Sequence, residues 1–416
     1  TFVWGAKAFG PVVGWIGGWA VAVSAIMVLA NVGEVTGKYF WLLLGNEEFA
    51  SNRVVVVITS VIFMAIMTFV STVGVQIGER MQMILMTIQI VAMVAFGVLA
   101  LWHALDGSNT GSIAFDWQWF NPAELGSWSG FMEAVLLALF IYWGWDTCLA
   151  LNEETKNPRK TPGRAAISTI VILIVLYVGI SVAVMMFAGF GDTGFGLTNE
   201  ANLDDVFSVL GGVLFGPWGW FLLLGVMLSA ASSTQTTILP TARGTLSMAV
   251  YRALPAKFAE LHPKFKTPWF STTVMGVAAI VYYVAMSILS EDMLADSLTS
   301  MGLAVALYYA ITSFACVWYF RDTLRDSARN LWMRGILPGL GGLMLAYAFI
   351  QSAIDMINVD YSYTVIFGIG GAFVIGVGAI LFGFVLMGIW WLRPNSKVYF
   401  RGESLNRDTP VLVPDE

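Results

Sequence analysis

One segment around position 144 combines residues that interrupt a helix with a residue that carries charge. Residues 140–147 read Phe-Ile-Tyr-Trp-Gly-Trp-Asp-Thr inside a stretch that is otherwise apolar. Gly144 lowers helix stability by about 1 kcal/mol relative to alanine, and Asp146 and Thr147 are residue types that cap helix N-termini. The pattern predicts two half-helices joined by an extended link between Trp143 and Asp146. One continuous helix, with Asp146 bonded to a neighbouring hydroxyl group, fits the spacing equally well.

A helix that breaks inside a membrane exposes groups that bind ions and charged solutes. The first half ends in unpaired carbonyl groups, and the second half begins with unpaired amide groups. A charged side chain such as that of Asp146 costs a few kcal/mol or more at the bilayer centre, so it is expected to face a cavity or a partner. The segment is therefore a candidate binding site.

A second segment, residues 229–237, has polar side chains at seven of its nine positions. Serine and threonine in a membrane helix bond the carbonyl groups one turn earlier and allow close helix packing, and Gln235 is suited to joining two helices. Alternatively, oxygen atoms of Ala230, Ser233 and Thr234 form part of a small-cation site, because hard cations prefer oxygen ligands.

The rest of the chain carries little enzyme chemistry. Its only histidines are His103 and His262, both near expected loops, so no histidine-based metal cluster is expected. Cys148 and Cys316 fall within expected helices, so no disulfide framework is expected either. No phosphate-binding glycine-rich loop occurs. We therefore expect no enzyme activity, no metal, no cofactor and no nucleic-acid partner.

The composition indicates which kind of structure must hold these segments in place. Of the 416 residues, 58% are apolar and 12% are charged, whereas soluble domains have roughly 45–50% and about 25%. The mean hydropathy is +0.76. Because so few charges cannot cover a water-facing surface of this size, lipid is the expected solvent. A soluble enzyme, a nucleic-acid-binding protein and a disordered scaffold all fit poorly.

Uncharged gaps of about 20 residues, the length of a membrane-spanning helix, recur along the chain. They predict ten spans, approximately residues 11–33, 54–75, 81–103, 131–152, 165–190, 217–241, 269–289, 297–320, 335–354 and 363–392, and then a solvated cytoplasmic tail at 393–416. Barrel strands would be short and alternating. The expected fold is an all-α integral membrane protein with one domain of ten transmembrane helices.

The basic residues predict the orientation of the chain. If its N-terminus is cytoplasmic, all but two of the 21 lysine and arginine residues fall in cytoplasmic segments, the exceptions being Lys38 and Arg53. Both ends are therefore expected on the cytoplasmic side of the cell membrane. Many spans joined by modest loops favour transport, since a sensor or scaffold usually carries a large soluble domain.

Three stretches carry a family resemblance, and their order relative to the spans is its main support. The first reads AFGP at 8–11 and GWIGGW at 14–19; the second reads FIYWGWD at 140–146, NEETKNP at 152–158 and PGRA at 162–165; the third reads AR at 242–243, LP at 254–255 and HPKFKTP at 262–268. These stretches resemble the loop entering helix 3, the broken helix 6 with its following loop, and the segment after helix 8 of the amino acid–polyamine–organocation permeases.

This resemblance implies a fold of twelve helices, whose first ten form two inverted repeats of five. The ten spans then match helices 3–12, and because the chain begins at Thr1 we expect it to be truncated before its first two helices. The family's first helix supplies a glycine-rich break that binds the substrate carboxylate. If the chain is the whole molecule, it is expected not to transport.

The resemblance also assigns roles to the first segment. Phe140 matches an aromatic residue that closes over bound substrate. The carbonyl groups from Phe140 to Trp143 match those that receive the substrate ammonium group, and Gly144 permits the extended link. Asp146 matches an often acidic position, which is expected mainly to cap the second half-helix. The implied substrate-binding residues are Phe140, Ile141, Tyr142, Trp143, Gly144 and Asp146.

The function that follows is secondary active transport of amino acids by alternating access, through symport or exchange. Some proton-driven relatives place a lysine on helix 5, where sodium-driven members hold sodium, but residues 81–105 contain no lysine. Na⁺ coupling, H⁺ coupling and ion-free exchange therefore stay open. A permease for polyamines or other organic cations and, in a different class, an ion channel are the alternatives. The expected partners are a small-molecule substrate and the lipid bilayer, and the sequence predicts no oligomeric state.

Overall fold

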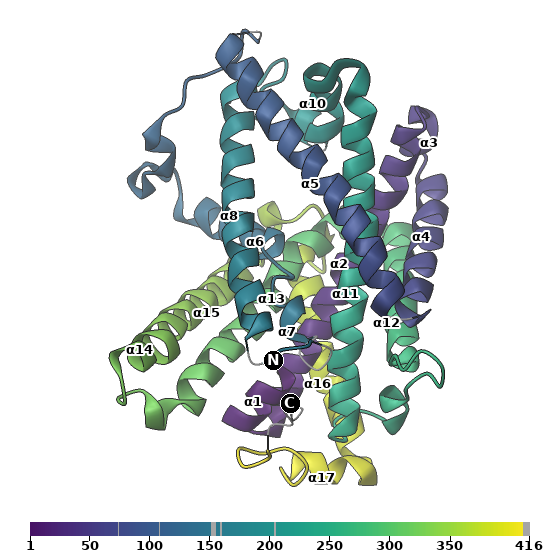
Figure 1. The fold of residues 1–416 in the computed structure, drawn as a ribbon, viewed down its shortest axis with the longest axis vertical. Helices are drawn as coiled ribbons and strands as arrows, with labels where there is room; N and C mark the ends of the chain where they lie inside the picture. Colours follow the sequence, from purple (N-terminus) through teal and green to yellow (C-terminus); the bar gives the residue numbers. More distant parts are fainter. Residues whose placement is uncertain (74, 108, 151–154, 159, 204, 411–416) are drawn as a thin grey trace.

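Long apolar helices make up most of the structure, which is a computed structural model (Figure 1). It describes residues 1–73, 75–107, 109–150, 155–158, 160–203 and 205–410. Within those ranges, nine helical segments are long and apolar enough to cross a membrane: Pro11–Leu43, Arg53–Val73, Arg80–Asp106, Thr161–Ala188, Val206–Val250, Trp269–Leu289, Leu294–Tyr319, Ala328–Asp355 and Gly371–Trp391. The expected all-α membrane fold is confirmed. The remaining expected span, 131–152, is not one long helix.

The helices follow one another in chain order. The long ones are α2 (Pro11–Leu43), α4 (Arg53–Val73), α5 (Val75–Asp106), α8 (Thr161–Ala188), α11 (Gly219–Val250), α12 (Trp269–Leu289), α13 (Glu291–Tyr319), α15 (Leu337–Asp355) and α16 (Gly371–Trp391). The shorter ones are α1 (Phe2–Phe9), α3 (Glu47–Ser51), α6 (Trp128–Ile141), α7 (Thr147–Ala150), α9 (Glu200–Leu203), α10 (Val206–Phe215), α14 (Ala328–Asn330) and α17 (Lys397–Phe400). Residue 74 and residues 151–152 of the expected spans, residues 152–154 of the second motif and residues 411–416 of the expected tail lie outside the described residues.

Helix α2 forms the centre of the bundle. It packs against α4, α11, α12, α13 and α16, and 67% of its most apolar window is buried, compared with 17% for α8. Small residues allow the close approach: a Cβ atom added at Gly37 would lie 2.2 Å from Ser60 Oγ of α4. Small residues at helix contacts are the usual basis of packing between membrane helices.

Helix α8 shows what the lipid-facing helices look like. Its exposed apolar residues recur at helical spacing along one face: Ile167, Val171, Ile174, Val175 and Val178. A soluble protein would cover such a stripe with other side chains. In a bilayer the stripe faces lipid tails, and the helix needs no polar outer face.

The last expected span, 363–392, is helical only from Gly371. Before it, β1 (Val365–Ile366) and β2 (Ile369–Gly370) form an antiparallel hairpin whose turn residues, Phe367 and Gly368, have φ of 53° and 79°. The fully buried carboxylate of Asp296 on α13 holds this hairpin, because it accepts hydrogen bonds from the backbone N–H groups of Tyr363 and Thr364, both at 2.9 Å. These bonds keep the segment out of the helix.

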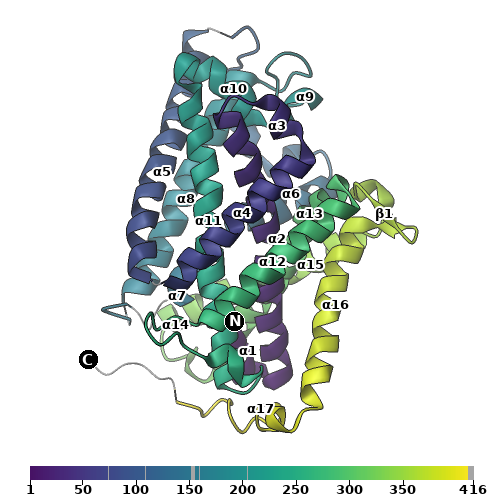
Figure 2. The ribbon, with the colours of Figure 1, turned by 90° about the vertical axis from the view of Figure 1, so that its right-hand side faces the viewer.

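The tail after α16 is packed on the bundle, so the expectation of a solvated tail is wrong for its first part (Figure 2). Tyr399 is fully buried and donates its hydroxyl to the carbonyl oxygen of Pro11 at 2.7 Å. Ser404 donates to the carbonyl oxygen of Tyr251 at 2.8 Å, and Leu405 is fully buried. The tail thereby joins the start of α2 to the end of α11.

Candidate functional site

The predicted break is present between two short helices. Helix α6 ends at Ile141 and α7 begins at Thr147. Between them Gly144 has φ of 98°, a conformation that glycine alone adopts readily. The prediction of a broken helix is therefore confirmed, and the alternative of one continuous helix is wrong. The first half ends two residues earlier than the predicted position at Trp143.

Neighbouring helices hold the end of α6 in place. Tyr177 of α8 donates its hydroxyl to the carbonyl oxygen of Ile141 at 2.9 Å. Trp143 turns the other way, and its Nε1 donates to the hydroxyl of Tyr308 on α13. Because Tyr308 is almost fully buried, this bond fixes the indole ring against the centre of the bundle.

The link also leaves backbone acceptors unpaired. Trp143 N donates to the Phe140 carbonyl oxygen at 3.0 Å, and Thr147 N donates to that of Gly144 at 3.1 Å. No described residue donates a hydrogen bond to the carbonyl oxygen of Tyr142 or of Trp143. Backbone acceptors without a donor are suited to a ligand that brings N–H groups.

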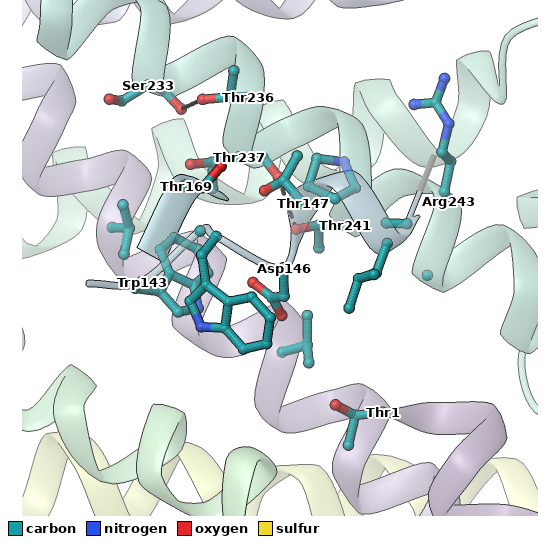
Figure 3. A pocket seen from close by; sticks show the side chains of 18 of the residues that line it. Thr1, Trp143, Asp146, Thr147, Thr169, Ser233, Thr236, Thr237, Thr241 and Arg243 are labelled. Atoms are coloured by element: carbon teal, nitrogen blue, oxygen red, sulfur yellow. Dashed lines mark hydrogen bonds between the residues drawn. The ribbon is translucent and has the colours of Figure 1, made fainter. Parts of the chain in front are cut away.

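A cavity of about 1500 Å³ lies beside the break, between α2, α5, α8 and α11 (Figure 3). Five of the six predicted substrate-binding residues line it: Phe140, Ile141, Trp143, Gly144 and Asp146. The sixth, Tyr142, does not line it, because its ring packs edge-on against Tyr177 with the ring centroids 5.2 Å apart. The structure thus brings the break and the cavity together.

Asp146 lies at the cavity wall, within reach of α13. Tyr309 donates its hydroxyl to Asp146 Oδ1 at 3.4 Å, and the ring of Trp145 stacks on that of Tyr309 with the centroids 6.1 Å apart. Figure 3 shows the carboxylate between Trp143 and the threonines of α11. The side chain of Asp146 therefore contacts α13, and its expected role as the cap of the second half-helix stays a prediction.

The polar run of residues 229–237 forms part of an unbroken helix, α11. Ser232 Oγ donates to the carbonyl oxygen of Ser229 at 3.1 Å, and Thr236 Oγ1 donates to that of Ser232 at 3.3 Å. These contacts confirm the interpretation that the hydroxyl groups bond their own helix. Pro240, within the same helix, has no N–H to offer the Thr236 carbonyl one turn earlier.

The three predicted cation-binding residues occupy different environments. Thr234 Oγ1 donates to the carbonyl oxygen of Ala230 at 3.3 Å, and both residues are buried in helix contacts. Ser233 instead lines the cavity. Among the described residues, no group of three or more His, Cys, Asp and Glu side chains is arranged to hold a metal ion.

Helix α5 contributes two glutamines that the sequence analysis did not single out. Gln82 Nε2 donates to the Ser232 carbonyl oxygen at 2.9 Å and to Gln235 Oε1 at 3.0 Å, so Gln235 does join two helices. Gln89 lines the cavity, and its Oε1 is buried without a hydrogen-bond partner among the described residues. The two glutamines lie seven residues apart, which is two helical turns, in an otherwise apolar span. This spacing places them on one face of the helix and could have identified them from the sequence.

Comparisons with known proteins give a consistent picture. A sequence profile described as amino acid permease matches residues 1–380. An uncharacterised transporter of Mycobacterium tuberculosis is 26% identical over 389 residues, which is 92% of this chain and 76% of the relative. The serine/threonine exchanger of Bacillus subtilis is 23% identical over 332 residues, 78% of this chain and 68% of the relative. A branched-chain amino acid permease of Bacillus subtilis is 26% identical over 220 residues, 52% of this chain and 43% of the relative.

Proposed function

Because the chain belongs to the amino acid permease family, within the amino acid–polyamine–organocation superfamily, we propose that it moves amino acids across the cell membrane by alternating access around the α6–α7 break. One observation carries this proposal. The carbonyl oxygen of Trp143, a residue of the cavity wall, has no donor among the described residues. An amino acid brings the N–H donors that this acceptor lacks.

The substrate ammonium group fits this end of the cavity. Hydrogen bonds to a charged group contribute about 1.5–3 kcal/mol each, and the carbonyl group of Trp143 offers one acceptor. The ring of Phe140 adds an aromatic wall beside them, and aromatic faces attract cations. Phe140, Ile141 and Trp143 give the pocket an apolar surface, which favours amino acids with neutral side chains.

The break also supplies the moving parts that alternating access requires. Helix α6 is tied to α8 and α13 through Ile141 and Trp143, whereas α7 begins beyond a glycine that no side chain crowds: a Cβ atom at Gly144 would meet nothing within 4 Å. A glycine between two half-helices allows one of them to tilt relative to the other around the bound solute.

For the coupling mode we propose exchange that needs no sodium. Two carbonyl oxygens of the candidate cation site already accept hydrogen bonds, that of Ala230 from Thr234 Oγ1 and that of Ser233 from Thr236 Oγ1. A sodium ion at this site would have to compete with these bonds. The Bacillus subtilis relative named as an exchanger supports the same choice.

Uptake into proteoliposomes tests the function. The full-length protein is reconstituted, the vesicles are preloaded with serine, threonine, leucine or valine, and entry of the labelled amino acid is followed with and without a sodium gradient. We expect saturable uptake that depends on the preloaded amino acid and not on sodium. Uptake that requires the sodium gradient would overturn the coupling mode, and flux that does not saturate would favour a channel.

We further propose that both ends of the described chain face the cytoplasm. The two basic residues that fall outside this pattern are each bonded inside the protein: Lys38 Nζ lies 3.8 Å from Asp205 Oδ2, and Arg53 donates to the carbonyl oxygen of Ser287. Labelling of a single cysteine introduced at exposed Arg401, in intact cells and in inverted vesicles, tests this. Reaction only in the inverted vesicles is expected.

A further inference from the structure

A second, smaller cavity lies beside Phe140. It has a volume of about 170 Å³ and lies between α6, α13, α15 and the turn that leads into the hairpin. These elements contact one another and meet in the same part of the molecule (Figure 2). Phe140 lines both cavities, so the two cavities are adjacent at this residue.

Two acceptor atoms of α15 in this cavity have no partner. Ser352 lines the cavity and is only 4% exposed, and its Oγ has no hydrogen-bond partner among the described residues. Asp355 Oδ2 is also buried without a hydrogen-bond partner among the described residues. Asp355 Oδ1, in contrast, accepts from Gln351 Nε2 at 2.9 Å. Residues three apart on a helix lie on one face. An unpaired buried carboxylate oxygen is costly, so the pair is suited to a ligand that donates.

The local electrostatics favour a positive ligand. The carboxylate of Asp355 supplies a negative charge, and Asp355 is also the last residue of α15. The C-terminal end of a helix carries the negative end of its dipole, which attracts cations. The nearby Asp296 carboxylate does not compete for the ligand, because it is occupied by the hairpin backbone.

The cavity wall favours an organic cation over a metal ion. Leu136, Leu137, Leu298 and Met356 make much of it apolar, and Thr299 Oγ1 already donates to the carbonyl oxygen of Ala295 at 3.2 Å. A hard metal ion needs about six or more oxygen ligands, and few face this cavity. A cavity of about 150 Å³ accommodates a molecule the size of benzene, so the volume suits a small amine.

We propose that this cavity binds the primary ammonium group of a small organic cation, with Asp355 Oδ2 and Ser352 Oγ as acceptors and the ring of Phe140 against the aliphatic part. The site stands independently of the transport function proposed above, because its test is a binding measurement. If transport is confirmed, the site lies next to the substrate cavity, which it adjoins at Phe140.

Calorimetric titration of the full-length protein in lipid nanodiscs with n-propylammonium chloride tests the proposal. Serine at saturating concentration is present in one arm, to occupy the larger cavity. We expect binding in both arms, weakened at least about tenfold in Asp355→Asn, because a charge-assisted hydrogen bond is lost. Ser352→Ala is expected to weaken it a few-fold. The matched control Asp360→Asn, at an exposed residue of the adjoining turn, should bind like wild type.

Several outcomes overturn the proposal. Equal affinity in wild type and Asp355→Asn would place the amine elsewhere. Sodium chloride that displaces n-propylammonium at equal concentration would indicate an inorganic cation site, and 1-propanol that binds as tightly would show that the charge is irrelevant. If Asp355→Asn does not fold, Ser352→Ala and Thr299→Val decide: the first must weaken binding and the second must not. If serine does not bind but Asp355→Asn still weakens the binding of n-propylammonium, the result counts against the proposed transport function and not against this site.

Discussion

Two largely apolar segments of this protein contain polar residues, and they respond in opposite ways. The 140–147 segment leaves the helix for five residues, from Tyr142 to Asp146, although only one of its residues is charged. Helix α11 carries seven polar side chains in nine positions and continues without a break. Polarity by itself therefore does not break a membrane helix.

The difference lies in where the polar atoms find partners. In α11 the hydroxyl groups of Ser232, Thr234 and Thr236 bond carbonyl groups of the same helix, and the bond from Gln235 to Gln82 of α5 leaves the helix intact. At the break, the polar atoms bond other helices, as Trp143 does with Tyr308. Gly144 supplies the left-handed backbone that lets the chain turn away. Partners in other helices together with a glycine make the break.

The largest effect is expected for Gly144→Ala. A side chain at this backbone conformation costs about 1–3 kcal/mol, and alanine favours a continuous helix by about 1 kcal/mol more. We expect uptake and substrate affinity to fall at least tenfold in proteoliposomes.

The control is Gly216→Ala, a glycine with φ of 53° that also has open space around it and does not line the larger cavity. It should lose stability, but the affinity of the folded protein for substrate should stay unchanged. Wild-type affinity in Gly144→Ala would mean that the bend at this residue is not needed.

The second effect concerns the bonds that attach α11 to α5. Gln82→Leu leaves Gln235 Oε1 without its donor and removes one of the donors to the Ser232 carbonyl, at a cost of about 1–3 kcal/mol. Thermal unfolding in detergent should therefore occur at a lower temperature. Thr87→Val on the same helix removes only a bond to its own backbone, from Thr87 to Met83, and should leave the transition in place. An equal decrease of the unfolding temperature in both variants would contradict the role given to the bonds of Gln82.

The third effect concerns the attachment of the break itself. Trp143→Phe removes the donor to Tyr308 and is expected to lower substrate affinity about fivefold, equivalent to about 1 kcal/mol. Tyr308→Phe should do the same. In the double variant the two losses should not add, because one bond is removed. Additive losses in the double-mutant cycle would show that the residues act separately.

The smallest effect is expected for Thr234→Val. A hydrogen bond inside a membrane protein contributes about 0.6 kcal/mol on average, and the valine keeps the shape of the side chain. Stability and uptake should hardly change, and sodium should remain without effect. A variant that loses a sodium dependence found in wild type would instead identify Thr234 as a cation ligand.

The sequence predicts those features that depend on neighbouring residues. Uncharged gaps locate the long helices because lipid demands apolar length, and Gly144 with Asp146 locates the break. Features that depend on distant partners are missed. The hairpin before Gly371 exists because Asp296, more than sixty residues earlier, bonds its backbone, and the tail packs because Tyr399 reaches Pro11. The cavity beside Asp355 also forms only when α6, α13 and α15 come together.

A structure of the full-length protein with a bound amino acid tests the central claim most directly. We expect the amino nitrogen to lie within about 3 Å of the carbonyl oxygen of Trp143, with Gly144 still in its left-handed conformation. A substrate whose amino group lies away from this carbonyl group, or a continuous helix through Gly144, would contradict it.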